Sequence, residues 1–351
     1  MWKIRKGLDA LNAYSIEEDD WAVKLDANER PRNLPPRVME RLMERLAALQ
    51  YNRYPEITPR SLREKIAGPL GLKADNVVIG NGSSELLAVL CYVFGGQGRK
   101  IVFPQPSFSM YFIYTSLADS QSVPVNLNAD FTLSAKEMLD TAIREEASLI
   151  ILCTPNNPTG TVMPFEDIEY IAAGAKCPVV VDEAYNEYYG KSAIDLLAKY
   201  PNLVVLRTFS KAYGLAAARV GYALAAKEIV DLVDKALTPF YVNNLSLTAA
   251  ATVFEMRDEF AADIAETVAE RERIEGGLSK IPGISVVPSQ TNFVLFKCAE
   301  AAKLNSFLMA KSIAIRNLDG APGLTSCLRV TVGTPAENDA FLAAVADYSK
   351  K

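Results

Sequence analysis

Residues that could do covalent chemistry are grouped around one lysine in this chain. Lys211 lies between small residues, and Arg219 follows it eight positions later in the 351-residue sequence. A lysine amine that is partly buried near other cations has a pKa that can be lowered, and the neutral amine can form a Schiff base with an aldehyde. The arrangement therefore predicts a lysine that carries an aldehyde cofactor.

Two upstream segments contain groups that could control a pyridine ring held on such a lysine. Asp182 closes an apolar run that begins at residue 178, and a carboxylate at the end of a rigid strand can keep a ring nitrogen protonated. Asn157 follows the apolar run 148–153, and Tyr185 lies three positions after Asp182. Their amide and phenol groups could donate hydrogen bonds to an ionised ring oxygen. These residue types predict a ring used as an electron sink.

A third segment has the features of a phosphate site. The sequence Gly80-Asn81-Gly82-Ser83-Ser84 lies between the strand-like run 76–79 and a helix-like stretch that begins at Leu86. Backbone N–H groups at the start of a helix bind anions, and an arginine can grip two phosphate oxygens at once. The residues expected to bind a phosphate are Ser83, Ser84, Thr208, Ser210 and Arg219.

The elements that must position these residues follow an α/β pattern. Helical stretches separate most of the apolar runs, which predicts a large domain with a mostly parallel sheet covered by helices. The cofactor residues fall at strand ends or helix starts, the usual ligand position in such sheets. Strands are expected at 76–79, 100–103, 148–153, 178–182, 203–208 and 219–223.

A smaller α+β domain is expected beyond a long helical stretch at 246–278. It would contain Arg316 and Arg329, on strands expected at 284–287, 291–296, 313–316 and 328–332. The chain exceeds the size at which single cores usually split into domains. We expect an N-terminal arm (1–30) that packs with the small domain, a large domain (31–240), and a linking helix with the small C-terminal domain (241–351).

Four further motifs complete a family resemblance. They are Leu25-Asp26-Ala27-Asn28-Glu29-Arg30-Pro31, Arg53-Tyr54-Pro55-Glu56, Pro104-Gln105-Pro106-Ser107-Phe108-Ser109-Met110-Tyr111 and Leu328-Arg329-Val330-Thr331-Val332-Gly333-Thr334. With the segments above, they resemble the pyridoxal-phosphate-dependent aminotransferases of fold type I, in the class II branch, and there the histidinol-phosphate aminotransferase family. The resemblance covers nearly the whole chain. One departure is that Ala217 and Ala218 stand where the family usually has a glycine and a larger aliphatic residue, which removes no chemical group.

The resemblance implies a cofactor, substrates and further site residues. Pyridoxal 5'-phosphate would be carried on Lys211, with Phe108 stacked on its ring. Tyr54 would reach across a homodimer to the neighbour's cofactor phosphate, so that the two copies share active sites. The implied reaction converts L-histidinol phosphate and 2-oxoglutarate to imidazole acetol phosphate and L-glutamate, a step of histidine biosynthesis. The residues implied to line the substrate pocket are Tyr14, Asn28, Arg316 and Arg329.

Composition narrows the function class further. The net charge is −5, and no basic tract is present, which argues against nucleic acid or an anionic membrane as the main partner. No apolar run approaches the roughly 18 residues of a membrane span, and no signal-like core follows the first residues.

The five cysteines are odd in number and form no CxxC pair, which is typical of a reducing compartment and favours the cytoplasm. With no histidine, histidine-ligated metals and histidine bases are excluded, so a lysine must transfer protons and no metal is expected.

Three alternatives stay open at this level. Aromatic amino-acid aminotransferases and L-threonine-O-phosphate decarboxylase share almost all of these motifs. A non-catalytic aminotransferase-like effector domain normally follows a DNA-binding segment, and about 30 residues before the first shared motif are too few for one. Each candidate residue also has a structural interpretation: Lys211 or Arg316 could be solvated, and Tyr14 or Tyr54 could make only a structural hydrogen bond.

Overall fold

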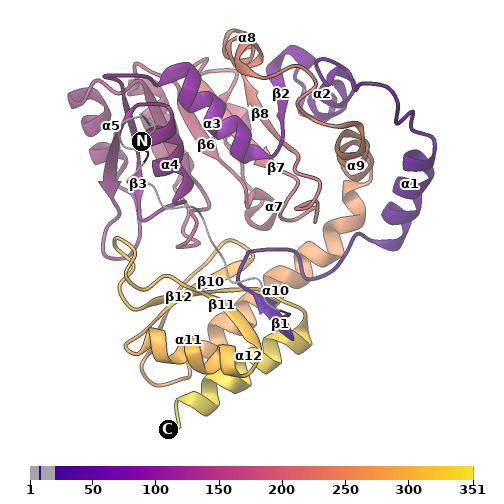
Figure 1. The fold of residues 1–351 in the computed structure, drawn as a ribbon. Helices are drawn as coiled ribbons and strands as arrows, with labels where there is room; N and C mark the ends of the chain where they lie inside the picture. Colours follow the sequence, from indigo (N-terminus) through magenta and orange to yellow (C-terminus); the bar gives the residue numbers. More distant parts are fainter. Residues whose placement is uncertain (1–7, 9–19, 351) are drawn as a thin grey trace, which may run out of the picture.

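A large sheet covered by helices on both faces dominates the structure. The computed structural model describes residues 8 and 20–350 (Figure 1). The sheet has the order β2-β8-β7-β6-β5-β3-β4, and β8 alone runs antiparallel to its neighbours. Its strands are β2 (Val77–Gly80), β3 (Lys100–Gln105), β4 (Gln121–Asn126), β5 (Leu149–Cys153), β6 (Val179–Asp182), β7 (Leu203–Thr208) and β8 (Gly221–Ala225).

The expected strands of this sheet are all present, but β4 was missed. Every residue of β5, β6 and β7 is buried, so these strands are continuous apolar runs that a sequence pattern can detect. Strand β4 lies at the edge of the sheet and pairs only with β3. Its sequence, Gln-Ser-Val-Pro-Val-Asn, is mostly exposed or half-buried and contains Pro124. An edge strand tolerates proline. Because the segment is polar and contains proline, it forms no continuous apolar run, and the pattern therefore did not predict it.

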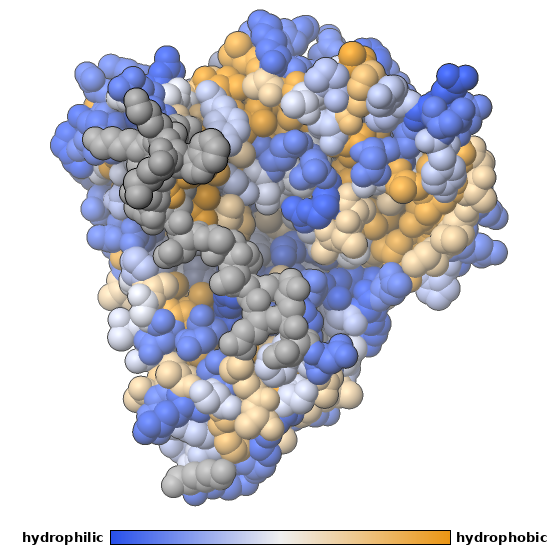
Figure 2. Space-filling model, viewed as in Figure 1, coloured by the Kyte–Doolittle hydropathy of each residue, from blue (hydrophilic) through white to orange (hydrophobic). Residues whose placement is uncertain are grey.

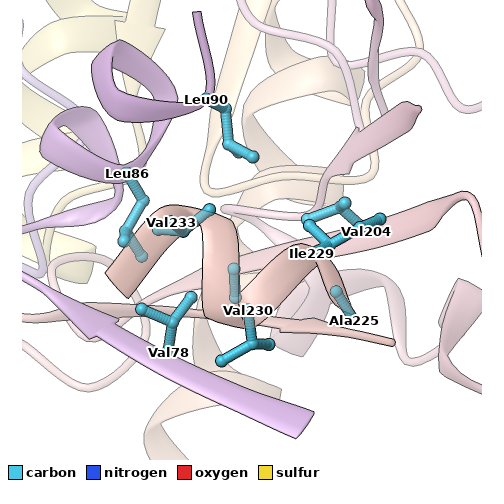
Figure 3. A pocket seen from close by; sticks show the side chains of 9 residues that line it. Val78, Leu86, Leu90, Val204, Ala225, Ile229, Val230 and Val233 are labelled. Carbon is cyan, nitrogen blue, oxygen red and sulfur yellow. The ribbon is translucent and has the colours of Figure 1, made fainter. Parts of the chain in front are cut away.

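Two layers of helices bury the two faces of this sheet. One core includes side chains of α3 (Ser83–Phe94), α4 (Met110–Leu117) and α8 (Lys227–Ala236). Figure 3 shows Leu86 and Leu90 of α3 and Val230 and Val233 of α8 near Val78 of β2. This apolar junction leaves no room for a water molecule, so it is packed core and not a ligand site. The other core includes side chains of α1 (Pro36–Ala47), α2 (Arg60–Ala67), α5 (Ala135–Arg144), α6 (Phe165–Gly174) and α9 (Asn244–Glu255).

A smaller five-stranded sheet forms below the large one in Figure 1. Its order is β1-β11-β12-β10-β9. The short edge strand β1 was not expected, and it brings the N-terminal segment into this sheet by pairing parallel with β11. The strands are β1 (Val23–Leu25), β9 (Ile284–Val287), β10 (Phe293–Cys298), β11 (Ile313–Asn317) and β12 (Cys327–Thr331). The helices packed here are α10 (Ala261–Leu278), α11 (Ala301–Ala310) and α12 (Pro335–Tyr348).

The prediction of a single long helix at 246–278 is wrong. Helix α9 ends at Glu255, and Met256 has φ −106° and ψ 23°, outside helical geometry. Phe260 then lies fully buried against the Tyr213 ring, with centroids 5.5 Å apart. Burying this aromatic side chain requires the chain to change direction before α10, so tertiary packing overrides the helical propensity of the segment.

The remaining elements are short. They are α7 (Asn186–Tyr189) and four 3₁₀ helices, η1 (Gly68–Leu70), η2 (Ala74–Asn76), η3 (Ala193–Leu196) and η4 (Arg257–Phe260). Across residues 8 and 20–350, no helix has both the length and the apolar character needed to cross a membrane.

Candidate active site

A cleft of about 480 Å³ opens where β5, β6 and β7 end and α3 begins. The carboxyl ends of parallel strands meet at one edge of a sheet, so residues far apart in sequence converge there. Most residues predicted for the cofactor and the substrate line this cleft. They are Asn28, Ser83, Ser84, Phe108, Asn157, Asp182, Tyr185, Thr208, Ser210, Lys211, Arg219 and Arg329.

Two predicted residues lie elsewhere in the structure, and a third, Tyr14, lies outside the described residues. Tyr54 is 80% exposed and stacks on Phe240, with ring centroids 4.6 Å apart. Arg316 is half-buried on β11 in register with Arg329 of β12, but it does not belong to the cleft lining. The structure of one chain thus collects the cofactor set but leaves Tyr54 directed to the outside.

Lys211 lies in the turn that follows β7. Its Nζ donates a hydrogen bond to the carbonyl oxygen of Ala27 at 3.1 Å and lies 5.9 Å from the centre of the Tyr185 ring. Burial, with further contributions from the cations of Arg329 and Arg219, lowers the pKa of Lys211 to about 8. Roughly a tenth of the amine is therefore neutral at pH 7, far more than in an ordinary lysine.

Asp182 is a buried carboxylate that lacks a countercharge. It is 4% exposed, and it accepts hydrogen bonds from the Tyr111 hydroxyl at 2.7 Å and the Ala184 backbone N–H at 3.2 Å. Burial raises its pKa to about 6, and the neighbouring carboxylate of Glu183 adds to this. No cation acts on its pKa within the described part of the chain. A protonated pyridine nitrogen would supply the missing charge, so the residue fits a pyridoxal ring.

The cleft has a separate anion-binding end. Ser83 and Ser84 form the first turn of α3, where backbone N–H groups lack partners within the helix. Arg219 approaches from the other side, with Nη1 donating to Ser210 Oγ at 3.5 Å and to the Ala216 carbonyl at 3.3 Å. Thr208 accepts a bond from the Ser210 backbone N–H at 3.1 Å. This cradle suits the phosphate of the same cofactor.

A glycine allows the strand and the helix to meet at this cradle. The first residue of β8, Gly221, passes the start of α3 so closely that a Cβ atom would lie 2.3 Å from the Ser83 backbone nitrogen. Any side chain there would push the strand off the helix start. Gly221, the glycine that ends the Lys211 motif, therefore allows β8 to lie directly against the start of α3 at the anion-binding end of the cleft.

A hydrogen-bonded group connects the small sheet to the cleft. Arg329 Nη1 donates to Asn157 Oδ1 at 2.7 Å, and its Nη2 donates to the Asp26 carbonyl at 2.7 Å. Asn28 Nδ2 donates to the Tyr185 hydroxyl at 2.9 Å. Asn28 has φ +54°, a left-handed conformation that asparagine tolerates better than most residues. The arm, the small sheet and the large sheet therefore share one polar network at the cleft.

The sequence-based prediction missed two residues at this site. Tyr111, which is buried and bonded to Asp182, was part of a quoted motif, but no role was assigned to it. Tyr114 lines the cleft, and its hydroxyl is hydrogen-bonded to the Ser84 side chain. Both lie on α4, at a three-residue spacing from Phe108 that places successive residues on one helical face. This spacing is the signal that could have identified them.

Fold and site together define an α/β protein whose large sheet carries a polar cleft around a buried lysine. The sequence model of the family "Aminotransferase class I and II" matches residues 22–345, and the chain belongs to this family. It is 41% identical to histidinol-phosphate aminotransferase of Thermococcus gammatolerans, over 97% of this chain and 96% of that protein. It is 37% identical to histidinol-phosphate aminotransferase of Caldanaerobacter subterraneus subsp. tengcongensis, over 97% of each chain.

A solved structure extends the comparison to the fold. Histidinol-phosphate aminotransferase from Sinorhizobium meliloti, in complex with pyridoxal-5'-phosphate, superposes with a TM-score of 0.91. It is 26% identical and the match covers 100% of this chain and 98% of that one. The resemblance and the fold class expected from sequence are therefore confirmed.

Proposed function

We propose that this chain is a pyridoxal-phosphate-dependent aminotransferase that converts L-histidinol phosphate and 2-oxoglutarate to imidazole acetol phosphate and L-glutamate. The observation that carries the proposal is the buried Lys211, with its lowered pKa, between the uncompensated Asp182 and the Arg219 cradle. The names of the relatives that are 37% and 41% identical support the choice of substrate.

Each part of the cofactor has matching residues in the cleft. Asp182 would hold the ring nitrogen, Asn157 and Tyr185 the ring oxygen, and Phe108 the ring face. When bound, the cofactor supplies an aldehyde that takes up the amino nitrogen and a ring that draws electrons from the bond losing its proton. The phosphate would lie on Ser83, Ser84, Thr208, Ser210 and Arg219.

Lys211 performs the proton transfer in both half-reactions. Its Nζ, whose lowered pKa makes the neutral form accessible near pH 7, accepts the proton from the substrate carbon and returns it to the cofactor carbon. The Ala27 carbonyl, 3.1 Å away, holds the ammonium form of this amine. The charges of Arg219 and Arg329 both lower the Lys211 pKa, which makes it easier for the amine to release the proton.

The substrate anions are assigned to the small-sheet side of the cleft. Arg329 would bind the phosphate of one substrate and a carboxylate of the other, with Asn28 beside it. Arg316, in register with Arg329, and Tyr14 would complete the pocket. Because Arg329 already bonds to Asn157 and Asp26, its guanidinium is oriented before the substrate arrives.

A homodimer with shared sites is part of this proposal. Apolar surface gathers over α1 and α9, at the right of Figure 2. Exposed side chains on and near these helices include Met43, Tyr54, Ile57, Phe240 and Leu245. Contiguous exposed apolar surface marks interaction sites, and Tyr54, proposed to reach the neighbour's cofactor phosphate, belongs to this surface.

The division of the chain and its location are likewise proposed. The arm (1–30), the large domain (31–240) and the small domain with its linking helix (241–351) are supported by the two separate sheets. The cytoplasm is supported by five cysteines that are all free thiols.

The experiment that tests this function is a visible spectrum of the purified protein with pyridoxal phosphate. We expect an absorbance band that is absent in Lys211→Ala. L-histidinol phosphate should bleach the band at a much lower concentration than L-phenylalanine, L-tyrosine or L-threonine-O-phosphate, and 2-oxoglutarate should restore it. Equal bleaching by the aromatic acids would indicate an aromatic aminotransferase, and carbon dioxide release from threonine phosphate would indicate the decarboxylase. Without any band, the binding-domain alternative would be favoured.

A further inference from the structure

One buried hydroxyl at the site has no part in the chemistry described above. Tyr111 of α4 is fully buried, and its hydroxyl donates to Asp182 Oδ2 at 2.7 Å. We propose that Tyr111 is a positioning residue that acts through Asp182, keeping this carboxylate ionised and aimed so that it holds the proton on the cofactor's ring nitrogen. The inference rests on the proposed cofactor and deepens its assignment.

The direction of the hydrogen bond is fixed by the chemistry of the pair. Burial raises the pKa of the Tyr111 phenol well above its ordinary value, so the hydroxyl keeps its proton and acts as a donor. Donation to the ionised form of a carboxyl group favours that form. A carboxylate has about four acceptor positions, and Tyr111 and the Ala184 N–H occupy two of them. Asp182 therefore retains acceptor capacity for a donor in the cleft.

A neutral donor suits this position better than a cation would. Glu183, the next residue, is bonded to Arg207 Nε at 2.8 Å, and that pair balances its own charge. A cation bonded to Asp182 would similarly neutralise the carboxylate and weaken its attraction for a protonated ring nitrogen. The hydrogen bond from Tyr111 offsets part of the increase that burial causes in the pKa of Asp182. It leaves the negative charge of the carboxylate available to the cofactor.

Packing holds the Tyr111 hydroxyl in place. The ring meets Phe108 edge to face, with centroids 5.6 Å apart and an angle of 88°, and lies 6.1 Å from Phe103. Asp182 itself is fixed by the pairing of β6 with β5, where it is in register with Cys153. Because rigid elements hold both residues, the hydrogen bond fixes the orientation of the Asp182 carboxylate.

The test compares Tyr111→Phe with the wild type by the ¹⁵N signal of ring-labelled pyridoxal phosphate. We expect the signal to move toward that of the unprotonated nitrogen. We also expect kcat to fall by about ten- to a hundredfold, the size of one lost hydrogen bond to a charged group, with little change in KM. Tyr222→Phe is the matched control, because Tyr222 of β8 is also a buried tyrosine and packs on Phe209 outside the cleft lining. It should keep the wild-type signal and kcat.

A double-mutant cycle distinguishes action through Asp182 from a general packing effect. In an Asp182→Asn background, Tyr111→Phe should change neither the ¹⁵N signal nor kcat further. An unchanged signal in Tyr111→Phe, or an equal loss of kcat in both backgrounds, would overturn the inference. If Tyr111→Phe does not fold, Tyr111→Met also removes the donor and adapts its shape to the site. Failure of the wild type to bind the cofactor would instead refute the proposed function.

Discussion

Two buried ionic clusters lie side by side at the end of β6. We call a cluster balanced where its cation bonds directly to a carboxylate, and unbalanced where its charged groups bond only to neutral partners. In the first, Arg207 bonds to Glu183 at 2.8 Å, and Glu187 lies 3.5 Å from the guanidinium. In the second, Asp182 has only neutral donors, and Lys211 bonds only to a carbonyl oxygen among the partners described. Asp182 and Glu183 are consecutive residues. Because consecutive side chains of an extended segment point to opposite sides, the two carboxylates belong to different clusters.

The pKa values of Arg207 and Lys211, the cations of the two clusters, shift in opposite directions. Burial alone would lower the pKa of Arg207, but the carboxylates of Glu183 and Glu187 outweigh it, and the pKa is raised. Burial and the nearby cations of Arg329 and Arg219 together lower the pKa of Lys211 to about 8. A balanced buried cluster serves the fold, whereas an unbalanced one is completed by a ligand.

The largest expected effect comes from the cation of the unbalanced cluster. Lys211→Ala should reduce transamination by about 10⁴-fold or more, because it removes the proton-transfer group. The urea midpoint should stay near that of the wild type, since no carboxylate loses its partner. Lys227→Ala, at an exposed lysine paired with Asp231, is the control and should keep full activity. Turnover of ordinary size in Lys211→Ala would refute the assignment of this lysine.

The two neighbouring carboxylates should respond in opposite ways. Asp182→Asn should lower kcat by about 10²- to 10³-fold, the size of a lost electrostatic contact in a transition state, with a nearly normal urea midpoint. Glu183→Gln leaves Arg207 without its main partner, so it should destabilise the fold by about 3–5 kcal/mol and keep its kcat per bound cofactor. Urea titration and steady-state kinetics on the same preparations check both outcomes. If Glu183→Gln loses catalysis and Asp182→Asn loses stability, the distinction between the clusters is wrong.

Uptake of the cofactor should depend on pH through Lys211. Only the neutral Lys211 amine would add to the cofactor aldehyde, so the rate of pyridoxal phosphate uptake should rise with pH through a midpoint near 8, the pKa of this amine, and level off at higher pH. Arg329→Gln removes the largest charge that lowers the Lys211 pKa, and its uptake profile should shift to higher pH. Stopped-flow absorbance between pH 6 and 10 measures both. A wild-type midpoint near the ordinary lysine value of 10.5 would show that the amine is not perturbed.

Most of the site could be predicted from the sequence because its residues follow strands whose apolar runs are unmistakable. Asp182 and Thr208 end β6 and β7, and the sheet edge brings them together without further information. The partnership of Tyr111 with Asp182 could not be predicted, because it joins α4 to the end of β6 across 71 residues of sequence. The break at Met256 and the edge strands β1 and β4 were missed for a similar reason, since contacts distant in sequence or weak patterns determine them.

The smallest expected effect concerns Tyr54, whose proposed partner lies on a second copy of the chain. At 80% exposure and stacked only on Phe240, the ring contributes little to its own fold. Tyr54→Phe should weaken pyridoxal phosphate binding by about three- to tenfold, the value of one hydrogen bond. Tyr51→Phe, at a neighbouring tyrosine that is 69% exposed, should leave the affinity unchanged.

Mixing two variants decides whether that hydroxyl acts within one chain or between two. A hybrid of Lys211→Ala and Tyr54→Phe chains has one site that combines an intact lysine with an intact tyrosine only if Tyr54 crosses the interface. Fluorescence titration of the hybrid should then reveal a class of sites with wild-type affinity. If every lysine-containing site binds as weakly as in Tyr54→Phe alone, Tyr54 serves its own chain. The unbalanced cluster would then be completed by the cofactor without help from a second copy.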